Sequence, residues 1–148
     1  LYEVMHRYAD PFHFLRAEPI IARLSKARRD DLATASEVDP ELVFDHATIY
    51  VLPDAAWSRR VCGVFGNHLA NRFRTRAHAV LTPNGQGGYT VSVRAPMAIG
   101  TGADALCRQF VTGGGRAEAA GINHLPRDAF QEFARRFEQA FSTAPHRP

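Results

Sequence analysis

Three consecutive glycines, Gly113, Gly114 and Gly115, stand directly before Arg116. Glycine permits backbone angles and close approaches that a side chain prevents, and successive free N–H groups can surround an anion. Arg116 adds a guanidinium, whose planar donors suit a phosphate. The stretch lacks the lysine and hydroxyl residue of a P-loop and does not read GxGxxG. It therefore indicates either an anion-binding loop or a flexible turn with a solvated arginine.

Positive charge gathers in the same part of the chain. The 148 residues carry a net charge of +3. Residues 55–123 hold eight arginines against Asp104 and Glu118, a net charge of +6, whereas residues 1–54 carry a net charge of −4. This distribution permits a nucleotide or nucleic-acid partner.

Length and composition indicate a globular protein of one domain, or of one domain with a helical extension. No apolar run reaches the roughly 18 residues that a membrane helix needs, so we expect a cytoplasmic protein with no membrane partner. Cys62 and Cys107 are the only cysteines, and they favour buried free thiols over a disulfide. The sequence begins with Leu1 rather than Met, which is compatible with a fragment of a longer chain, and whether the chain is a fragment or complete stays open.

The elements that must position these residues follow from periodicity and turn signals. Helical spacing is found over residues 1–10, 19–34 and 56–73, and residues 46–53 form a short apolar strand. On the helix over 56–73, we interpret the polar group of Asn67, His68 and Asn71 as an exposed face rather than a groove.

The second half continues the alternation of strands and helices. Residues 77–82 and 89–96 form a hairpin around the turn PNGQGG. Thr101 and Asp104 resemble a capping box that opens a helix to Phe110, and AGINHL is a further strand. Pro126 opens a final helix with a core-facing stripe of Phe130, Phe133, Phe137 and Phe141. The order predicts an α/β fold, a mixed β-sheet with flanking helices, preceded by a helical connector.

The hairpin strand ending in SVRAP, the short helix, GGGRAEAAG and the next strand together resemble the C-terminal DHH-associated domain of the DHH phosphoesterase family. In that family a serine/arginine element ends the hairpin strand, the loop reads GGGH, and AAG opens the next strand. Ser92 and Arg94 match the first element, and Gly113, Gly114 and Gly115 match the second. The resemblance covers roughly residues 46–141 and is sharpest over about 90–123.

The resemblance implies a role for these residues in binding substrate. Ser92, Arg94, Gly113, Gly114, Gly115 and Arg116 would hold the phosphate or sugar end of an oligonucleotide, a cyclic dinucleotide or a nucleoside phosphate. Residues 44–148 would be the substrate-binding domain, and residues 1–43 its connector. The family has histidine where this chain has Arg116. Arginine still binds phosphate, but it is neither a neutral acceptor nor a proton donor of ordinary pKa.

The chemistry of the family belongs to an N-terminal domain, where an Asp-His-His motif helps to hold manganese or a similar divalent metal. This chain has no Asp-His-His, and its nearest match, Asp45-His46-Ala47, reads as the start of a strand. We therefore predict no catalytic residue, no metal ligand and no cofactor on this chain. The metal would lie on a missing N-terminal DHH domain of the same protein, and whether the chain is part of an active hydrolase stays open.

Two alternatives remain. The chain could be a stand-alone nucleic-acid-binding or regulatory module without catalysis, in which the electropositive middle binds single-stranded nucleic acid. Only Tyr89 and Trp57 are obvious stacking candidates for that role. In the second alternative, the chain is a degenerate relative of the family with a purely structural role. The sequence leaves the phosphorylated substrate and the oligomeric state undetermined.

Overall fold

The computed structural model describes residues 10, 12 and 19–142. Apart from Asp10, the helix expected over residues 1–10 lies outside the described residues. The elements are α3 (Pro19–Ser36), β1 (Leu42–Val43), β2 (Ala47–Val51), α4 (Ala56–Arg72), β3 (Ala77–Pro83), β4 (Gly88–Arg94), α5 (Ala103–Cys107), β5 (Gly113–Gly115), β6 (Ala119–Pro126), a 3-10 turn (Arg127–Ala129) and α6 (Phe130–Phe141).

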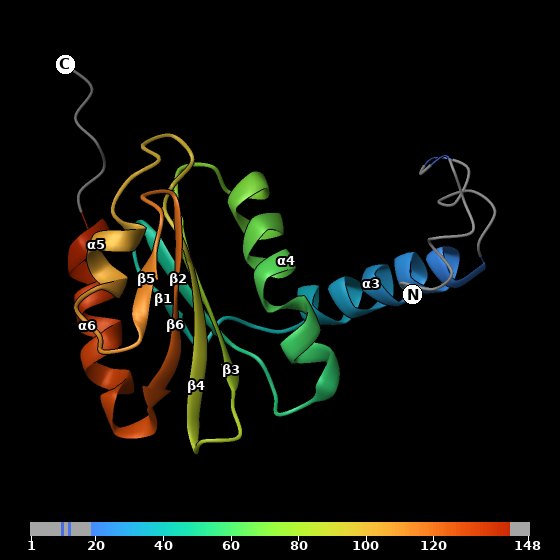
Figure 1. Ribbon diagram of the computed structural model, residues 1–148. Helices are drawn as coiled ribbons and strands as arrows, with labels where there is room; N and C mark the ends of the chain where they lie inside the picture. The colour runs from blue at the N-terminus through green and yellow to red at the C-terminus, as the bar shows by residue number, and fades with distance from the viewer. Residues whose placement is uncertain (1–9, 11, 13–18, 143–148) are drawn as a thin grey trace.

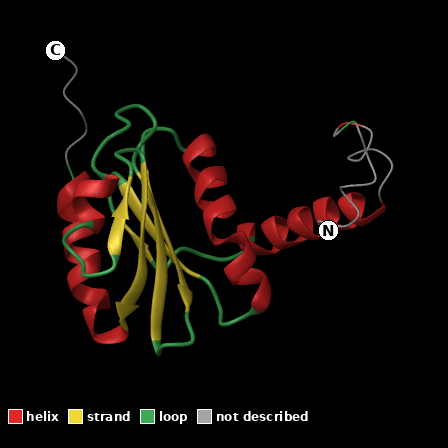
Figure 2. Cartoon of the chain, viewed as in Figure 1, coloured by secondary structure: helices red, strands yellow, loops and turns green. Residues whose placement is uncertain are grey.

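The six strands form one mixed sheet in the order β1-β2-β3-β4-β6-β5. Strands β2 and β3 are parallel, and the other neighbours are antiparallel. Helix α4 covers one face, and α5 and α6 cover the other, whereas α3 packs on α4 and extends away from the sheet (Figures 1 and 2). The predicted α/β fold with a mixed sheet is confirmed. The division at residues 43 and 44 stays a prediction, and β1 places Leu42 and Val43 in the sheet.

The core under α6 is built by the predicted phenylalanine stripe. Phe133, Phe137 and Phe141 are buried, and Phe130 is half-buried. The rings of Phe133 and Phe137 stack at 5.8 Å between centroids, and Phe141 meets Phe137 edge-on at 5.3 Å. Phenylalanines three and four residues apart thus lie on the one face of α6 that packs on the sheet, as the sequence predicted.

The central strand β3 is buried on both faces. Leu81 belongs to the core under α6, whereas Val80 packs with Phe65 and Leu69 of α4. A strand covered on both sides needs apolar residues at nearly every position, which is why AHAVLT shows no alternation of polar and apolar residues. Cys62 and Cys107 are free and buried, as expected.

The start of α5 differs from the prediction. No side chain caps the helix, so the capping box of Thr101 and Asp104 is wrong, and the helix ends at Cys107. Its N-cap is Gly102, with φ of +104°, and a Cβ on Gly102 would lie 3.2 Å from the ring of Phe141. A left-handed residue in close contact with α6 is needed there, and glycine supplies it without strain.

Within the described residues, no helix combines the length and apolarity needed to cross a membrane.

Candidate anion-binding site

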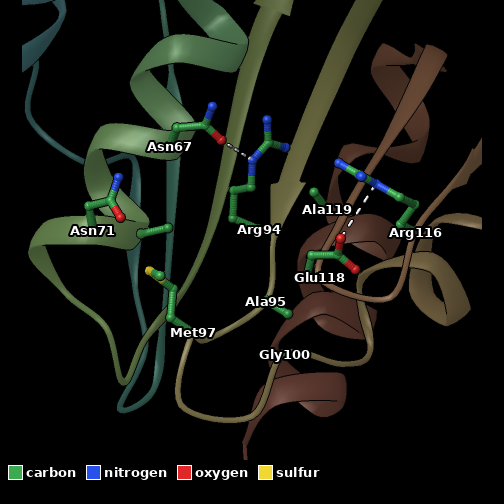
Figure 3. Close-up of a pocket in the computed structure, with 10 residues that line it drawn as sticks. Asn67, Asn71, Arg94, Ala95, Met97, Gly100, Arg116, Glu118 and Ala119 are labelled. Atoms are coloured by element: carbon green, nitrogen blue, oxygen red, sulfur yellow. Dashed lines mark hydrogen bonds and ion pairs between the residues drawn. The ribbon is translucent and has the colours of Figure 1, made fainter.

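A pocket of about 380 Å³ lies between α4 and the connection from β5 to β6 (Figure 3). Three parts of the chain line this pocket with polar or large side chains. Helix α4 contributes Asn67 and Asn71, and β4 with the loop after it contributes Arg94 and Met97. The β5–β6 connection contributes Arg116 and Glu118.

Strand pairing brings the two arginines to this pocket. Arg94 is the last residue of β4 and pairs with Ala119, the first residue of β6. The backbones of Arg116 and Ala119 exchange hydrogen bonds of 2.9 and 3.2 Å, which closes a tight turn. Residues separated by 22 positions in sequence therefore meet at one end of the sheet.

The guanidinium of Arg94 is held by neutral acceptors. Its Nε donates to Asn67 Oδ1 at 2.7 Å, and its Nη1 donates to Ser92 Oγ and to the Val93 carbonyl, both at 2.9 Å. Its Nη2 lies 3.4 Å from the Gly63 carbonyl. These contacts fix the orientation of the group and use at most four of its five donors.

The positive charge of Arg94 has no carboxylate partner at ion-pair distance among the described residues. Burial lowers the pKa of Arg94, and the nearby charge of Arg116 also acts to lower it. Arginine nevertheless stays protonated in proteins. A half-buried cation without a counter-charge is costly, so an anion bound beside it would be favoured.

Arg116 is held much more loosely than Arg94. Its side chain is 80% exposed, and its Nε lies 3.4 Å from Oε1 of Glu118. Exposed pairs of this kind contribute at most about 1 kcal/mol. The guanidinium of Arg116 can therefore exchange Glu118 for another anion at little cost.

The structure brings together some of the site residues that the sequence predicted. Arg94 and Arg116 line the pocket, and Ser92 lies behind Arg94 and orients it. Gly113, Gly114 and Gly115, expected as a loop, form strand β5 at the edge of the sheet, and none of them lines the pocket. Their part in binding stays a prediction.

Packing accounts for two of the three glycines. A Cβ on Gly113 would collide with the backbone of Cys107 in α5. Gly115 has φ of +143°, and a Cβ there would lie 2.5 Å from Cα of Ala120. Because Arg116 and Ala119 form a hydrogen-bonded pair, the N–H of Gly115 points away from β6, toward the open edge. The glycine run thus lets α5 and β6 approach β5 closely.

Asn67 and Asn71 are exposed, as expected, but the face that they share is also a wall of the pocket, which the sequence interpretation did not favour. They lie four residues apart on α4. Their face meets the loop after β4, in which Ala98 N–H donates to the Arg74 carbonyl at 3.1 Å. His68, grouped with them in the sequence, lies instead in a separate cavity of about 200 Å³. The four-residue spacing of the asparagines could have indicated that they share one face of the helix. The sequence did not show that the loop after β4 completes a pocket against that face.

Metal ligands are not gathered anywhere in the described part of the chain. No group of three or more His, Cys, Asp and Glu side chains there could hold a metal ion.

No protein-family model matches the sequence, and no curated protein matches it. Solved structures are similar in fold. The C-Ala domain of Aquifex aeolicus alanyl-tRNA synthetase is 18% identical with a TM-score of 0.53, over 71% of this chain and 99% of that one. RecJ from Thermus thermophilus, in complex with Mg²⁺, is 23% identical with a TM-score of 0.56, over 86% of this chain and 20% of that one. The pGpG-specific phosphodiesterase PggH of Vibrio cholerae is 13% identical with a TM-score of 0.58, over 94% of this chain and 50% of that one.

The chain therefore shares its fold with the C-Ala domain and with parts of RecJ and PggH. The resemblance carried by Ser92, Arg94 and the glycine run predicted this fold, and that prediction is confirmed. At these identities the likeness establishes the fold alone. The chain spans between a fifth and a half of the length of RecJ and PggH.

Proposed function

We propose that this chain is the substrate-binding domain of a DHH-type phosphoesterase acting on oligonucleotides, cyclic dinucleotides or nucleoside phosphates. The observation that carries the proposal is the half-buried guanidinium of Arg94. Asn67, Ser92 and Val93 orient it, no carboxylate of the described residues pairs with it, and Arg116 lies beside it at the same pocket. Two guanidiniums in this position suit the oxygens of a phosphate group.

The role of this chain would be to bind and orient, and the hydrolytic step would belong to another domain. We propose that manganese or a similar divalent metal is held by an N-terminal DHH domain of the same protein, where it would activate water. The described residues offer no fitting ligand set for it. Arg116 in place of the family histidine would contribute positive charge to the substrate site but no proton transfer near neutral pH.

The proposal is tested by the variants Arg94→Ala and Arg116→Ala. Each removes a charge-assisted contact worth about 1.5–3 kcal/mol, so each lowers the affinity for a phosphorylated ligand by about 10- to 150-fold. An amide NMR titration of the 148-residue chain with a mononucleotide and a short single-stranded oligonucleotide measures both affinity and place. We expect shifts centred on Arg94 and residues 113–116.

Arg59→Ala is the matched control. Arg59 lies in the first turn of α4, where it pairs with Asp54 at 2.7 Å, and it does not line the pocket. It should bind these ligands as the unchanged chain does, and thermal unfolding should show all three variants folded. Unchanged affinity in both pocket variants would overturn the assignment.

The second candidate is a nucleic-acid-binding module without catalysis. The observation that favours it is the match over 99% of the C-Ala domain, which belongs to an alanyl-tRNA synthetase. This alternative predicts diffuse, salt-sensitive shifts along α4 and the arginines that follow it, rather than shifts centred on Arg94.

A further inference from the structure

The two sides of the pocket differ in chemistry. Figure 3 shows Arg116 and Glu118 on the side of the β5–β6 connection, Asn71 and Met97 on the side of α4, and Arg94 between them. One side therefore offers charge, whereas the other offers an amide and an apolar surface.

The charged side is short. Its two guanidiniums are accompanied by the carboxylate of Glu118, 3.4 Å from Arg116. A run of phosphates carries negative charge on each unit, so it needs cations along its length and is repelled by a carboxylate among them. Glu118 can, in contrast, accept hydrogen bonds from the hydroxyls of a sugar. The charged side thus fits a single phosphate followed by a hydroxyl-bearing group.

The α4 side suits a planar aromatic ring. Met97 is 44% exposed although it is a large apolar side chain, and the buried Ala70 also lines the pocket. Thioethers make favourable contacts with aromatic rings. Asn71 makes no side-chain hydrogen bond with the described residues, so its amide is available as both a donor and an acceptor for the edge of a base.

We infer that the pocket selects a nucleotide unit over a polyphosphate. The phosphate lies on Arg94 and Arg116, the sugar faces Glu118, and the base lies over Met97 with its edge at Asn71. The volume of about 380 Å³ is within the range of about 300–1,000 Å³ that ligand pockets occupy. The inference rests on the proposed function, because it assumes that Arg94 and Arg116 bind phosphate.

Three probes separate the parts of this inference, namely AMP, ribose 5-phosphate and tripolyphosphate. The first two share a phosphate and a sugar, and only AMP carries a base. Titrated into the 148-residue chain and followed by amide NMR, AMP should bind at least about 3-fold more tightly than ribose 5-phosphate and should shift Asn71 and Met97. Tripolyphosphate should not bind more tightly than AMP.

Variants on each side of the pocket complete the test. Met97→Ala and Asn71→Ala should each lower the affinity for AMP by about 2- to 10-fold and leave the affinity for ribose 5-phosphate unchanged. Glu118→Ala should strengthen the binding of tripolyphosphate. Arg94→Ala should lower the affinity for all three probes.

The possible failures are distinguishable. The inference is overturned if AMP and ribose 5-phosphate bind with equal affinity, or if neither Met97→Ala nor Asn71→Ala changes the affinity for AMP. Either result leaves the proposed function standing. Tighter binding of tripolyphosphate than of AMP also overturns it. Probe binding that is insensitive to both Arg94→Ala and Arg116→Ala overturns the proposed function as well.

Discussion

Arg94 and Arg116 are the same residue type in opposite environments. Arg94 is fixed by hydrogen bonds to α4 and β4, and Arg116 projects from a turn with one loose ion pair. A fixed group is preorganised and loses little freedom when a ligand binds, whereas a mobile group must be ordered first. Arg94 should therefore supply geometry as well as charge, and Arg116 mainly charge.

The lysine variants separate these two roles. Arg94→Lys keeps the charge but loses the planar fork that reaches Asn67, Ser92 and Val93 together, so it should lower mononucleotide affinity by about 10-fold or more. Arg116→Lys should lower it by less than about 3-fold. Titration calorimetry on both variants measures the difference. Equal losses would contradict the distinction.

A buried histidine makes the fold sensitive to acid. His78 on β3 is 1% exposed and contacts the ring of Phe73. The pKa of His78 is lowered from 6.5 to about 4, chiefly by burial; the Phe73 backbone opposes this shift, and the charge of Arg76 contributes to it. Because the folded-state pKa is depressed, the contribution to stability is present above pH 6.5 and is lost as the pH falls toward 4.

His78→Leu should remove this part of the acid sensitivity. The unchanged chain should lose about 3 kcal/mol of unfolding free energy between pH 6.5 and 4 through this group, since one pKa unit corresponds to about 1.4 kcal/mol. Urea unfolding at a series of pH values measures the loss. The same slope in His78→Leu would contradict the assignment.

At the scale of elements, β5 shows how a glycine run can be structural. Its three residues alternate between close contact and open space, because Gly113 meets α5, Gly115 meets β6, and Gly114 has nothing within 4 Å of an added Cβ. The packing of α5 and β6 around this edge therefore requires glycine at the first and third positions only.

Alanine at each position tests this pattern. Gly113→Ala and Gly115→Ala should each destabilise the chain by about 1–3 kcal/mol, through overlap with Cys107 or through strain at a positive φ. Gly114→Ala should be neutral or stabilising by up to about 1 kcal/mol. Thermal and urea unfolding give the three values. If Gly114→Ala also leaves AMP affinity unchanged, the side-chain space above Gly114 plays no part in binding.

The elements divide into those that local pattern determines and those that contacts determine. Helices α4 and α6 and the hairpin of β3 and β4 agree with their periodicity and turn signals. Strand β5 and the start of α5 do not, because Gly113 lies against Cys107 and Gly102 lies against Phe141, too close for a larger side chain. Such contacts are set by packing between elements, which a short window of sequence does not contain.

For the whole molecule, salt dependence distinguishes a pocket from a charged surface. The middle of the chain has a net charge of +6, enough to attract nucleic acid without any pocket. A site that holds one or two phosphates should give a slope of log K against log salt of about −0.7 to −1.4. Binding spread along the arginines of α4 should give a steeper slope that falls with each arginine removed.

The measurement is the affinity of a short single-stranded oligonucleotide at several salt concentrations. We expect the shallow slope, with Arg94→Ala reducing affinity at every concentration and Arg59→Ala having no effect. A steep slope that responds to Arg59→Ala would favour the nucleic-acid-binding module instead.

Periodicity, turn residues and local motifs were enough to predict the α/β class, the phenylalanine face of α6 and the hairpin, and to select Ser92, Arg94 and Arg116 as candidates. The pocket, in contrast, depends on contacts between elements. Pairing of β4 with β6 brings Arg94 to the turn that carries Arg116, and the loop after β4 sets Met97 beside Asn71. Strand register and helix packing set these neighbours, and both depend on residues far apart in sequence. The polar face of α4 could therefore be recognised from the sequence, but the pocket beside it could not.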